Sequence, residues 1–386
     1  MTIHDDHTQN SGPVIVGVLA DPVAAPSEVA QQLEQDLPGL LSEQLPDREW
    51  KVEVYRERLP PSDMRDFEMM NLATERKRQR DWHFAVCVTD LPLIVDGHAV
   101  AADASSSRNV AVVSLPAFGA MALRRRVREV AAQLIMDLYC RGTPDEDSQE
   151  HRQRRISALS GAFRRTTPDQ DGIDLRILAS RGRLRLLIGM VRDNRPWRLV
   201  SGLRGALVGA FAFSAFYLIN TTLWELALTM SVWQRVATVT ASITVMLTWL
   251  IVYHHLWERK KNLPPQEREL TVLFNASTVT TLTIGLVTGY LALYVLNLIA
   301  TFLVFTPEVF SQYVDPEPGL AEHLIVALIT TAAATVAGAI GSGFESEESV
   351  REAAYSYRER ERREALQRSR AAETDDETLA ETARDT

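Results

Sequence analysis

The chain has 386 residues, with 46% hydrophobic and 24% charged side chains and a net charge of −9 from 41 basic and 50 acidic residues. These averages are ordinary for a soluble protein, and they conceal a polar first half and an apolar second half. The acidic balance disfavours nucleic acid as a partner. Cys87 and Cys140 show neither CxxC nor metal-ligand spacing, so we expect a reduced cytosolic domain with no metal and no cofactor.

Residues 1–12 are polar and acidic. They contain no basic n-region and no apolar h-region, so they predict no secretory signal. We expect this N-terminal segment to be disordered.

Short apolar runs alternate with amphipathic segments over residues 13–170. This alternation is typical of α/β layers, and we expect a cytosolic domain with a mixed sheet and covering helices. The expected strands are residues 13–20, 50–58, 82–89, 98–102 and 109–115, and the expected helices are residues 27–44, 63–80 and 120–140.

The turn after the first strand has no glycine-rich nucleotide fingerprint. It contains neither GxGxxG nor GxxxxGK[ST], so a conventional phosphate cradle is absent. Asp21 and Asp90 follow the first and third strands, where open α/β sheets bind ligands. They are the candidate ligand-binding residues, although helix capping or turn formation also explains an aspartate at either place.

The segment Val88-Thr-Asp-Leu-Pro-Leu is followed by a hairpin ending in Ala111-Val-Val-Ser-Leu and by the helix over residues 121–139. In this order of elements, residues 14–140 resemble the archaemetzincin family of zinc peptidases. That family carries HExxHxxGxxH on the helix, with two histidines that hold zinc and a glutamate base. Here the corresponding residues are Arg128-Glu-Val-Ala-Ala132, so Glu129 remains and both ligands are missing. The resemblance implies a peptidase-like scaffold without its metal, and we expect no catalysis.

Residues 171–198 alternate arginine with leucine, isoleucine and valine, and they precede a long apolar stretch. This pattern predicts an amphipathic linker on the membrane surface that attracts anionic lipid. Nucleic acid binding is the weaker alternative, because the run adjoins a membrane segment. The predicted membrane-surface residues are Arg181, Arg183, Arg185, Arg192, Arg195, Trp197 and Arg198.

Four apolar stretches predict a four-helix transmembrane region over residues 199–343. Each is near or above the about 20 residues that cross a bilayer. The third would be about 50 Å long as a helix, and we expect one long helix whose 275–283 end lies partly outside the hydrocarbon. The stretches are residues 199–222, 233–256, 272–305 and 320–342.

Loop charges predict the orientation of these helices. Residues 176–204 carry eight arginines and one acid, whereas Arg235, at the start of the second stretch, is the only basic residue near the connection between the first two stretches. Lysine and arginine near a span stay on the cytoplasmic side, so we expect both termini in the cytoplasm. Because 37 of the 41 basic residues are arginine, as in GC-rich bacterial coding, we expect a bacterial plasma membrane.

Small residues recur on one face of the apolar stretches, and two GxxxG pairs occur. Such faces let helices approach closely, either inside one bundle or between copies in a homo-oligomer. Asn297 is the one strongly polar residue deep in a stretch, and no paired intramembrane acids indicate coupled transport. The candidate packing residues are Gly205, Gly209, Gly285, Gly289 and Gly338.

Residues 344–370 predict a charged cytosolic helix, and residues 371–386 predict a disordered acidic tail. The sequence as a whole predicts a membrane protein whose non-catalytic α/β domain binds a protein or small-molecule partner while the helices anchor or oligomerise it. The alternative is a pore-forming or transport protein with a cytosolic regulatory domain.

Overall fold

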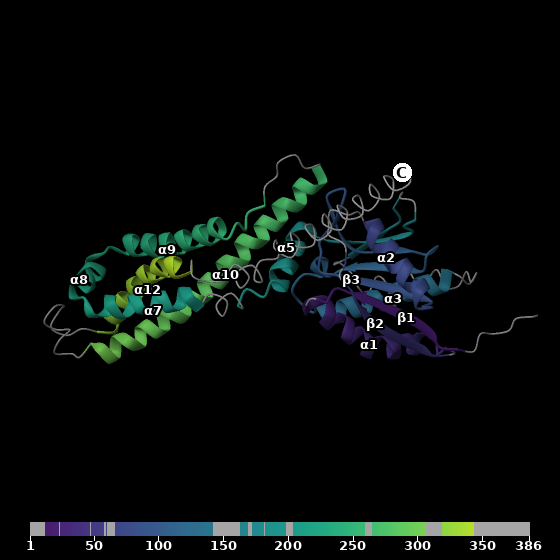
Figure 1. Cartoon of the computed structure of the whole chain (residues 1–386), viewed down its shortest axis with the longest axis horizontal. Helices are drawn as coiled ribbons and strands as arrows, with labels where there is room; N and C mark the ends of the chain where they lie inside the picture. The colour runs from purple at the N-terminus through teal and green to yellow at the C-terminus, as the bar shows by residue number, and fades with distance from the viewer. Residues whose placement is uncertain are drawn as a thin grey trace, which may run out of the picture. The chain divides into compact units, whose positions relative to one another are not determined.

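The computed structural model describes residues 12–22, 24–46, 48–57, 59, 66–141, 163–168, 172–180, 182–197, 204–258, 265–305 and 319–342. The described chain divides into two compact units (Figure 1). The α/β unit runs to Asp193 and includes residues 265–270, and the helical unit contains the remaining described residues from Asn194. The predicted termini (1–11, 344–370 and 371–386), Arg181 and Arg198 lie outside the described residues.

The α/β unit contains one mixed sheet of eight strands in the described part of the chain. Four parallel strands lie in the order β2-β1-β3-β6, and antiparallel pairing then adds β5, β8 and β7, while β4 pairs with the start of β5. The strands are β1 Val14–Ala20, β2 Trp50–Arg56, β3 Phe84–Thr89, β4 Leu93–Val95, β5 His98–Ser105, β6 Val110–Ser114, β7 Phe163–Thr166 and β8 Leu175–Ala179.

The parallel strands β3 and β6 are buried along their whole length, which requires cover on both faces of the sheet. Helices α1 and α3 contact each other, whereas α2 contacts β3 and β6. In Figure 1, α1 and α2 lie on either side of the strands. The helices of this unit are α1 Ala24–Gln44, α2 Asp66–Gln79, η1 Leu115–Phe118, α3 Leu123–Arg141 and α5 Gly182–Asp193. The predicted α/β architecture of a mixed sheet with covering helices is therefore present.

The predicted boundary at residue 170 was too early. Strand β8 pairs with β5, and α5 packs on η1, so the α/β unit continues to Asp193. A Cβ on Gly189 would lie 2.1 Å from the carbonyl oxygen of Pro116, so glycine allows α5 to contact η1 directly. The amphipathic pattern of the linker thus places Leu186 and Met190 in a protein core.

The helical unit contains α7 Arg204–Ile219, α8 Thr221–Thr229, α9 Val232–Tyr253, most of α10 Pro265–Val304, and α12 Leu320–Ser342. By length and composition α9, α10 and α12 could each span a membrane. Helices α7 and α8 meet at an angle of 89° and add a fourth span only if the pair is counted as one. Asn220 accounts for the break, because its side chain accepts a hydrogen bond from Thr222 N and caps α8.

The third predicted stretch forms one helix, α10, as expected. Apart from Val272, its large exposed apolar side chains begin at Ile284 and continue to Val304. These 21 residues rise about 31 Å, which matches one hydrocarbon thickness. The part of α10 before Ile284 is therefore not needed to cross the hydrocarbon core.

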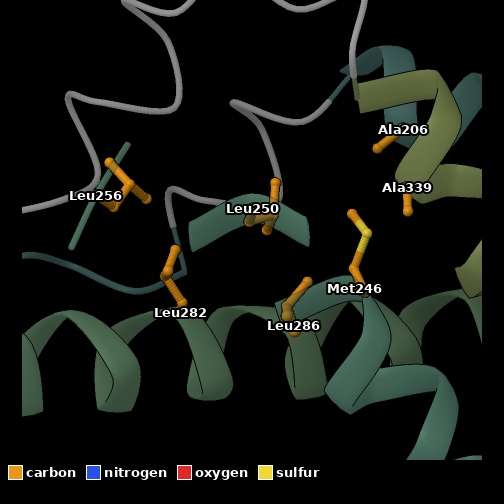
Figure 2. Packing of buried hydrophobic residues seen from close by; sticks show 7 residues of the cluster. All are labelled: Ala206, Met246, Leu250, Leu256, Leu282, Leu286 and Ala339. Carbon is orange, nitrogen blue, oxygen red and sulfur yellow. The ribbon is translucent and has the colours of Figure 1, made fainter. Parts of the chain in front are cut away.

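The centre of the helical unit is α12. Half of the apolar segment of α12 is buried, compared with 17% of the apolar segment of α9. Figure 2 shows the cluster that joins the helices, with Met246 and Leu250 of α9 near Leu286 of α10. Its remaining members are Ala206, Leu256, Leu282 and Ala339.

Candidate functional site

The carboxyl edge of the parallel strands brings the two candidate aspartates to adjacent strand ends. Asp21 follows β1 and Asp90 follows β3, which pair in register through Ala20 and Val88. The two aspartates are 2% and 0% exposed. The carboxyl edge of parallel strands is where open α/β sheets bind ligands, and two carboxylates there would suit a ligand with hydrogen-bond donors or positive charge.

Hydrogen bonds organise the loop that carries Asp90. Leu91 N donates to Thr89 Oγ1 at 3.1 Å, and Ser114 Oγ donates to the Leu91 carbonyl at 2.6 Å. Both hydroxyls are buried, so the end of β6 holds the turn after β3 in place. Neither of these two bonds involves the Asp90 side chain, so turn formation by Asp90 stays a prediction.

Cys87 lies next to this edge and is fully buried in β3. Burial raises the pKa of the Cys87 thiol, and the nearby charge of Asp21 raises it further. A thiol held protonated in this way is a poor nucleophile. In the described part of the chain, no group of three or more His, Cys, Asp or Glu side chains could hold a metal ion.

Helix α3 places Glu129 at the surface of the domain, where its side chain forms an ion pair on the same helix. Glu129 Oε1 accepts from Arg125 Nε at 2.8 Å, and Arg128 donates to Asp36 of α1 at 3.0 Å. Ala132 is buried. Arg128, Glu129 and Ala132 therefore contribute ion pairs and core packing.

A buried ion pair joins β5 and β8, and no pattern in the sequence predicted it. Arg176 Nε and Nη2 donate to the two Asp103 carboxylate oxygens at 2.8 and 2.7 Å, and both side chains are almost completely buried. Burial raises the pKa of Asp103, and the hydrogen bonds and charge of Arg176 lower it part of the way back. Arg176 belongs to the basic segment 176–204 that predicts the cytoplasmic side of the first apolar stretch, but it lies in strand β8 of the sheet. The only signal in the sequence was an aspartate inside the apolar run of β5.

Three of the described arginines of the linker contact other groups of the α/β unit. Arg183 pairs with Glu269 at 2.6 Å, the Arg185 guanidinium lies over the ring of Phe163 at 5.1 Å, and Arg192 donates to the Gly119 carbonyl at 3.1 Å. Arg195 has a positive φ of 50° and is half-buried, and Trp197 is exposed.

Small residues bring α7 and α12 together. A Cβ on Gly338 would lie 2.9 Å from the Ala206 carbonyl oxygen, and one on Gly341 would lie 2.7 Å from that of Gly205. A Cβ on Gly209 would contact Gly341 at 3.4 Å. The first GxxxG pair thus supports a contact inside one chain.

The second GxxxG pair, Gly285 and Gly289, borders a cavity of about 50 Å³ between α7, α9, α10 and α12. Tyr290 and Thr335 are the polar residues in its lining. Tyr290 already donates its hydroxyl hydrogen to the Leu328 carbonyl at 3.0 Å. The cavity is thus a mostly apolar gap among small side chains.

Polar side chains inside the helical unit bond to neighbouring helices. Asn297 Nδ2 donates to Thr331 Oγ1 at 3.0 Å, and the Tyr294 hydroxyl donates to the Leu324 carbonyl at 3.4 Å. Trp224 of α8 donates to the Leu218 carbonyl at 3.1 Å and packs on Phe305, with ring centroids 4.0 Å apart. These bonds join α10 to α12 and fix α8 across one end of the helices.

Comparison with known proteins adds no relative to this geometry. The chain matches no family model, no curated protein and no solved structure.

Proposed function

We propose that this protein is a multi-pass protein of a bacterial plasma membrane whose α/β unit binds a protein or small-molecule partner in the cytoplasm without catalysis. Its helical unit anchors that domain through four spans. The resemblance to a zinc peptidase would then reflect a scaffold that has lost its metal ligands.

The observation that carries the anchoring role is the use of polar groups inside the helical unit. A transport path needs polar or ionisable groups that face the substrate. Here the amide of Asn297 and the hydroxyl of Tyr290 bond to α12. Trp224 and Ala227 of α8, which follow the α7–α8 bend, are buried and pack on residues of α7, α10 and α12. These contacts favour a closed, packed anchor.

Reconstitution of the full chain into liposomes tests this role. We expect no ion or solute flux above that of protein-free vesicles, measured with entrapped fluorescent reporters. Flux that is lost in an Asn297→Ala variant would support the pore-forming or transport alternative and contradict the anchoring proposal.

The binding role rests on Asp21 and Asp90 at the ends of β1 and β3. Hydrogen–deuterium exchange of the full chain against pools of small cationic and amide-bearing metabolites should reveal protection at these two strand ends. Asp21→Asn and Asp90→Asn should remove the protection, whereas Asp96→Asn, in an exposed turn, should retain it. Stoichiometric zinc in the purified chain would contradict the non-catalytic proposal.

Homo-oligomerisation is supported by one face of α9. Four small residues there are exposed, and a second copy could cover them in the membrane. They are Ala237, Ala241, Thr244 and Thr248. Native mass spectrometry of the full chain should show a dimer or larger species that Ala241→Leu weakens, and a purely monomeric wild type would exclude this role.

A further inference from the structure

Two segments that are far apart in the sequence are held on the same stretch of α10. Asn194 Nδ2 donates to Ser277 Oγ at 3.3 Å and to Thr281 Oγ1 at 3.0 Å. Asn275 clamps the backbone of Glu258, because its Oδ1 accepts from Glu258 N and its Nδ2 donates to the Glu258 carbonyl, both at 2.9 Å. All of these residues belong to the helical unit. The starts of two loops are therefore fixed at similar heights along one helix.

Apolar contacts strengthen the second attachment. Leu256, which follows α9, is 2% exposed and belongs to the same cluster as Leu282 of α10. Figure 2 shows Leu256 beside this part of α10. Its neighbour Trp257 is 54% exposed. The segment after α9 thus packs one side chain on α10 and presents the next to its surroundings.

The exposed face of α10 gives the depth of this site. Thr281 and Asn275 precede Ile284 by three and nine residues. They therefore lie about 5 and 14 Å beyond the start of the lipid-exposed face. A headgroup layer occupies roughly the first 5–8 Å outside the hydrocarbon on each side of a bilayer. Thr281, and with it the first loop start, is thus at headgroup level, whereas Asn275 lies about 6 Å above that layer.

The side chains at this level suit an anionic membrane surface. Trp197, Tyr253 and Trp257 are exposed, as expected for the aromatic belt of a membrane protein. Arg195 directly follows the fixed Asn194, and the sequence that continues from both loop starts is basic. Acidic side chains are sparse here, with Glu258 and Asp193 the nearest in sequence.

We infer that this end of the helical unit binds the headgroup of an anionic phospholipid. Arg195 contacts the lipid phosphate, Trp197 and Trp257 lie in the headgroup layer, and Asn275 is a positioning residue that holds the loop after α9. The site residues belong to the helical unit, so the inference does not depend on the ligand-binding role proposed for the α/β unit.

Lipid titration of the purified full chain, followed by native mass spectrometry, tests the inference. The probes are dioleoylphosphatidylglycerol and dioleoylphosphatidylcholine. We expect the wild type to prefer the anionic lipid, and the preference to fall as salt is raised because the contact is electrostatic. Arg195→Gln should weaken binding of the anionic lipid about fivefold, the factor that corresponds to about 1 kcal/mol for one basic residue.

A pair of asparagines on α10 supplies a matched control. Asn275→Ala should lower the preference for the anionic lipid, whereas Asn297→Ala, which removes a buried amide deeper in the same helix, should leave it unchanged. Equal binding of both lipids by the wild type would overturn the inference. An unchanged lipid preference in Arg195→Gln would also overturn it, because this substitution removes the charge without requiring a change in the fold. Equally tight binding of inorganic phosphate would also overturn it by identifying a general anion site.

Discussion

At the scale of single residues, the most consequential side chain is Arg176. It is 5% exposed and forms three hydrogen bonds with Asp103 between β5 and β8. Removing one partner of a buried pair leaves an uncompensated charge, whereas an exposed pair contributes little. The pair therefore fixes the far side of the sheet, where β8 extends the domain beyond the predicted boundary.

Arg176→Leu should destabilise the α/β unit by about 3–5 kcal/mol, because Asp103 would stay buried without its partner. Thermal unfolding of the full chain, monitored by limited proteolysis at each temperature, measures the effect. Arg183→Leu is the control: its side chain is 71% exposed, and loss of its pair with Glu269 should cost less than about 1 kcal/mol. Similar losses in both variants would show that the buried pair is unimportant.

The same variant should show a distinct pH dependence. Without Arg176, only burial acts on Asp103, and burial raises its folded-state pKa above the unfolded value. Such a group stabilises the fold when protonated, below the unfolded pKa, and this contribution is lost as pH rises through the folded pKa. The stability gap between wild type and Arg176→Leu should therefore narrow as pH is lowered from about 8 to about 5. A gap that widens on acidification would refute this origin.

At the scale of elements, glycine positions decide which helices can touch. Gly189 brings α5 onto η1, and Gly338 and Gly341 bring α12 onto α7. In each case the atom that a new Cβ would meet is a backbone carbonyl oxygen, which cannot rotate away as a side chain can. These contacts are therefore less tolerant of substitution than ordinary core positions.

Gly189→Leu should displace α5 from η1 and expose Leu186 and Met190. Hydrogen–deuterium exchange over α5 should become faster in this variant. Ile188 is the exposed neighbour of Gly189, and Ile188→Ala should leave the exchange over α5 unchanged. Unchanged protection of α5 in Gly189→Leu would show that the helix is held by other contacts.

Gly341→Val should destabilise the helical unit by about 1–3 kcal/mol through overpacking against the Gly205 carbonyl. Unfolding in mixed micelles with a rising fraction of sodium dodecyl sulfate measures the change. Ile340→Ala, one residue earlier and 71% exposed, is the matched variant and should change stability by less than about 1 kcal/mol. Equal effects would contradict a specific α7–α12 contact.

At the scale of the whole molecule, the number of spans depends on the pair α7 and α8. Helix α7 has 16 residues and rises about 24 Å, less than a hydrocarbon core, before the chain bends by 89° at Asn220. If α7 crosses the bilayer, α8 lies on the side opposite the α/β unit. If it does not, α8 lies on the same side and the chain has three spans.

Thiol labelling in intact cells separates these topologies. Glu225→Cys places a thiol on the exposed side of α8, and it should react with a membrane-impermeant maleimide without permeabilisation. Cys140, in the α/β unit, should react only after permeabilisation, and Cys87 should stay unreactive because it is fully buried. Labelling of Glu225→Cys only after permeabilisation would favour three spans.

Local patterns in the sequence predicted much of the fold. The runs around Val16, Val86 and Val112 are short, apolar and bounded by turn residues, so each predicted a strand that the structure contains. The apolar run that includes Leu286 likewise predicted one long helix. The packing of α5 was not predicted, because an amphipathic pattern shows that one side of a helix is covered but not by which element. For α5 the cover is η1, and Pro116 is far from Gly189 in the sequence.

Part of the candidate site also followed from the sequence. Asp21 and Asp90 could be placed at strand ends because turns follow buried strands, but their burial and the bonds among Thr89, Leu91 and Ser114 depend on which strands become neighbours. The sequence by itself determined the apolar helices and the α/β alternation, because each depends on composition and spacing along the chain. Only the tertiary structure decided the Asp103–Arg176 pair, the α7–α12 contact and the clamp of Asn275 on Glu258. Each of these joins residues that are distant in the sequence, and such contacts are set by packing and hydrogen bonding rather than by local periodicity.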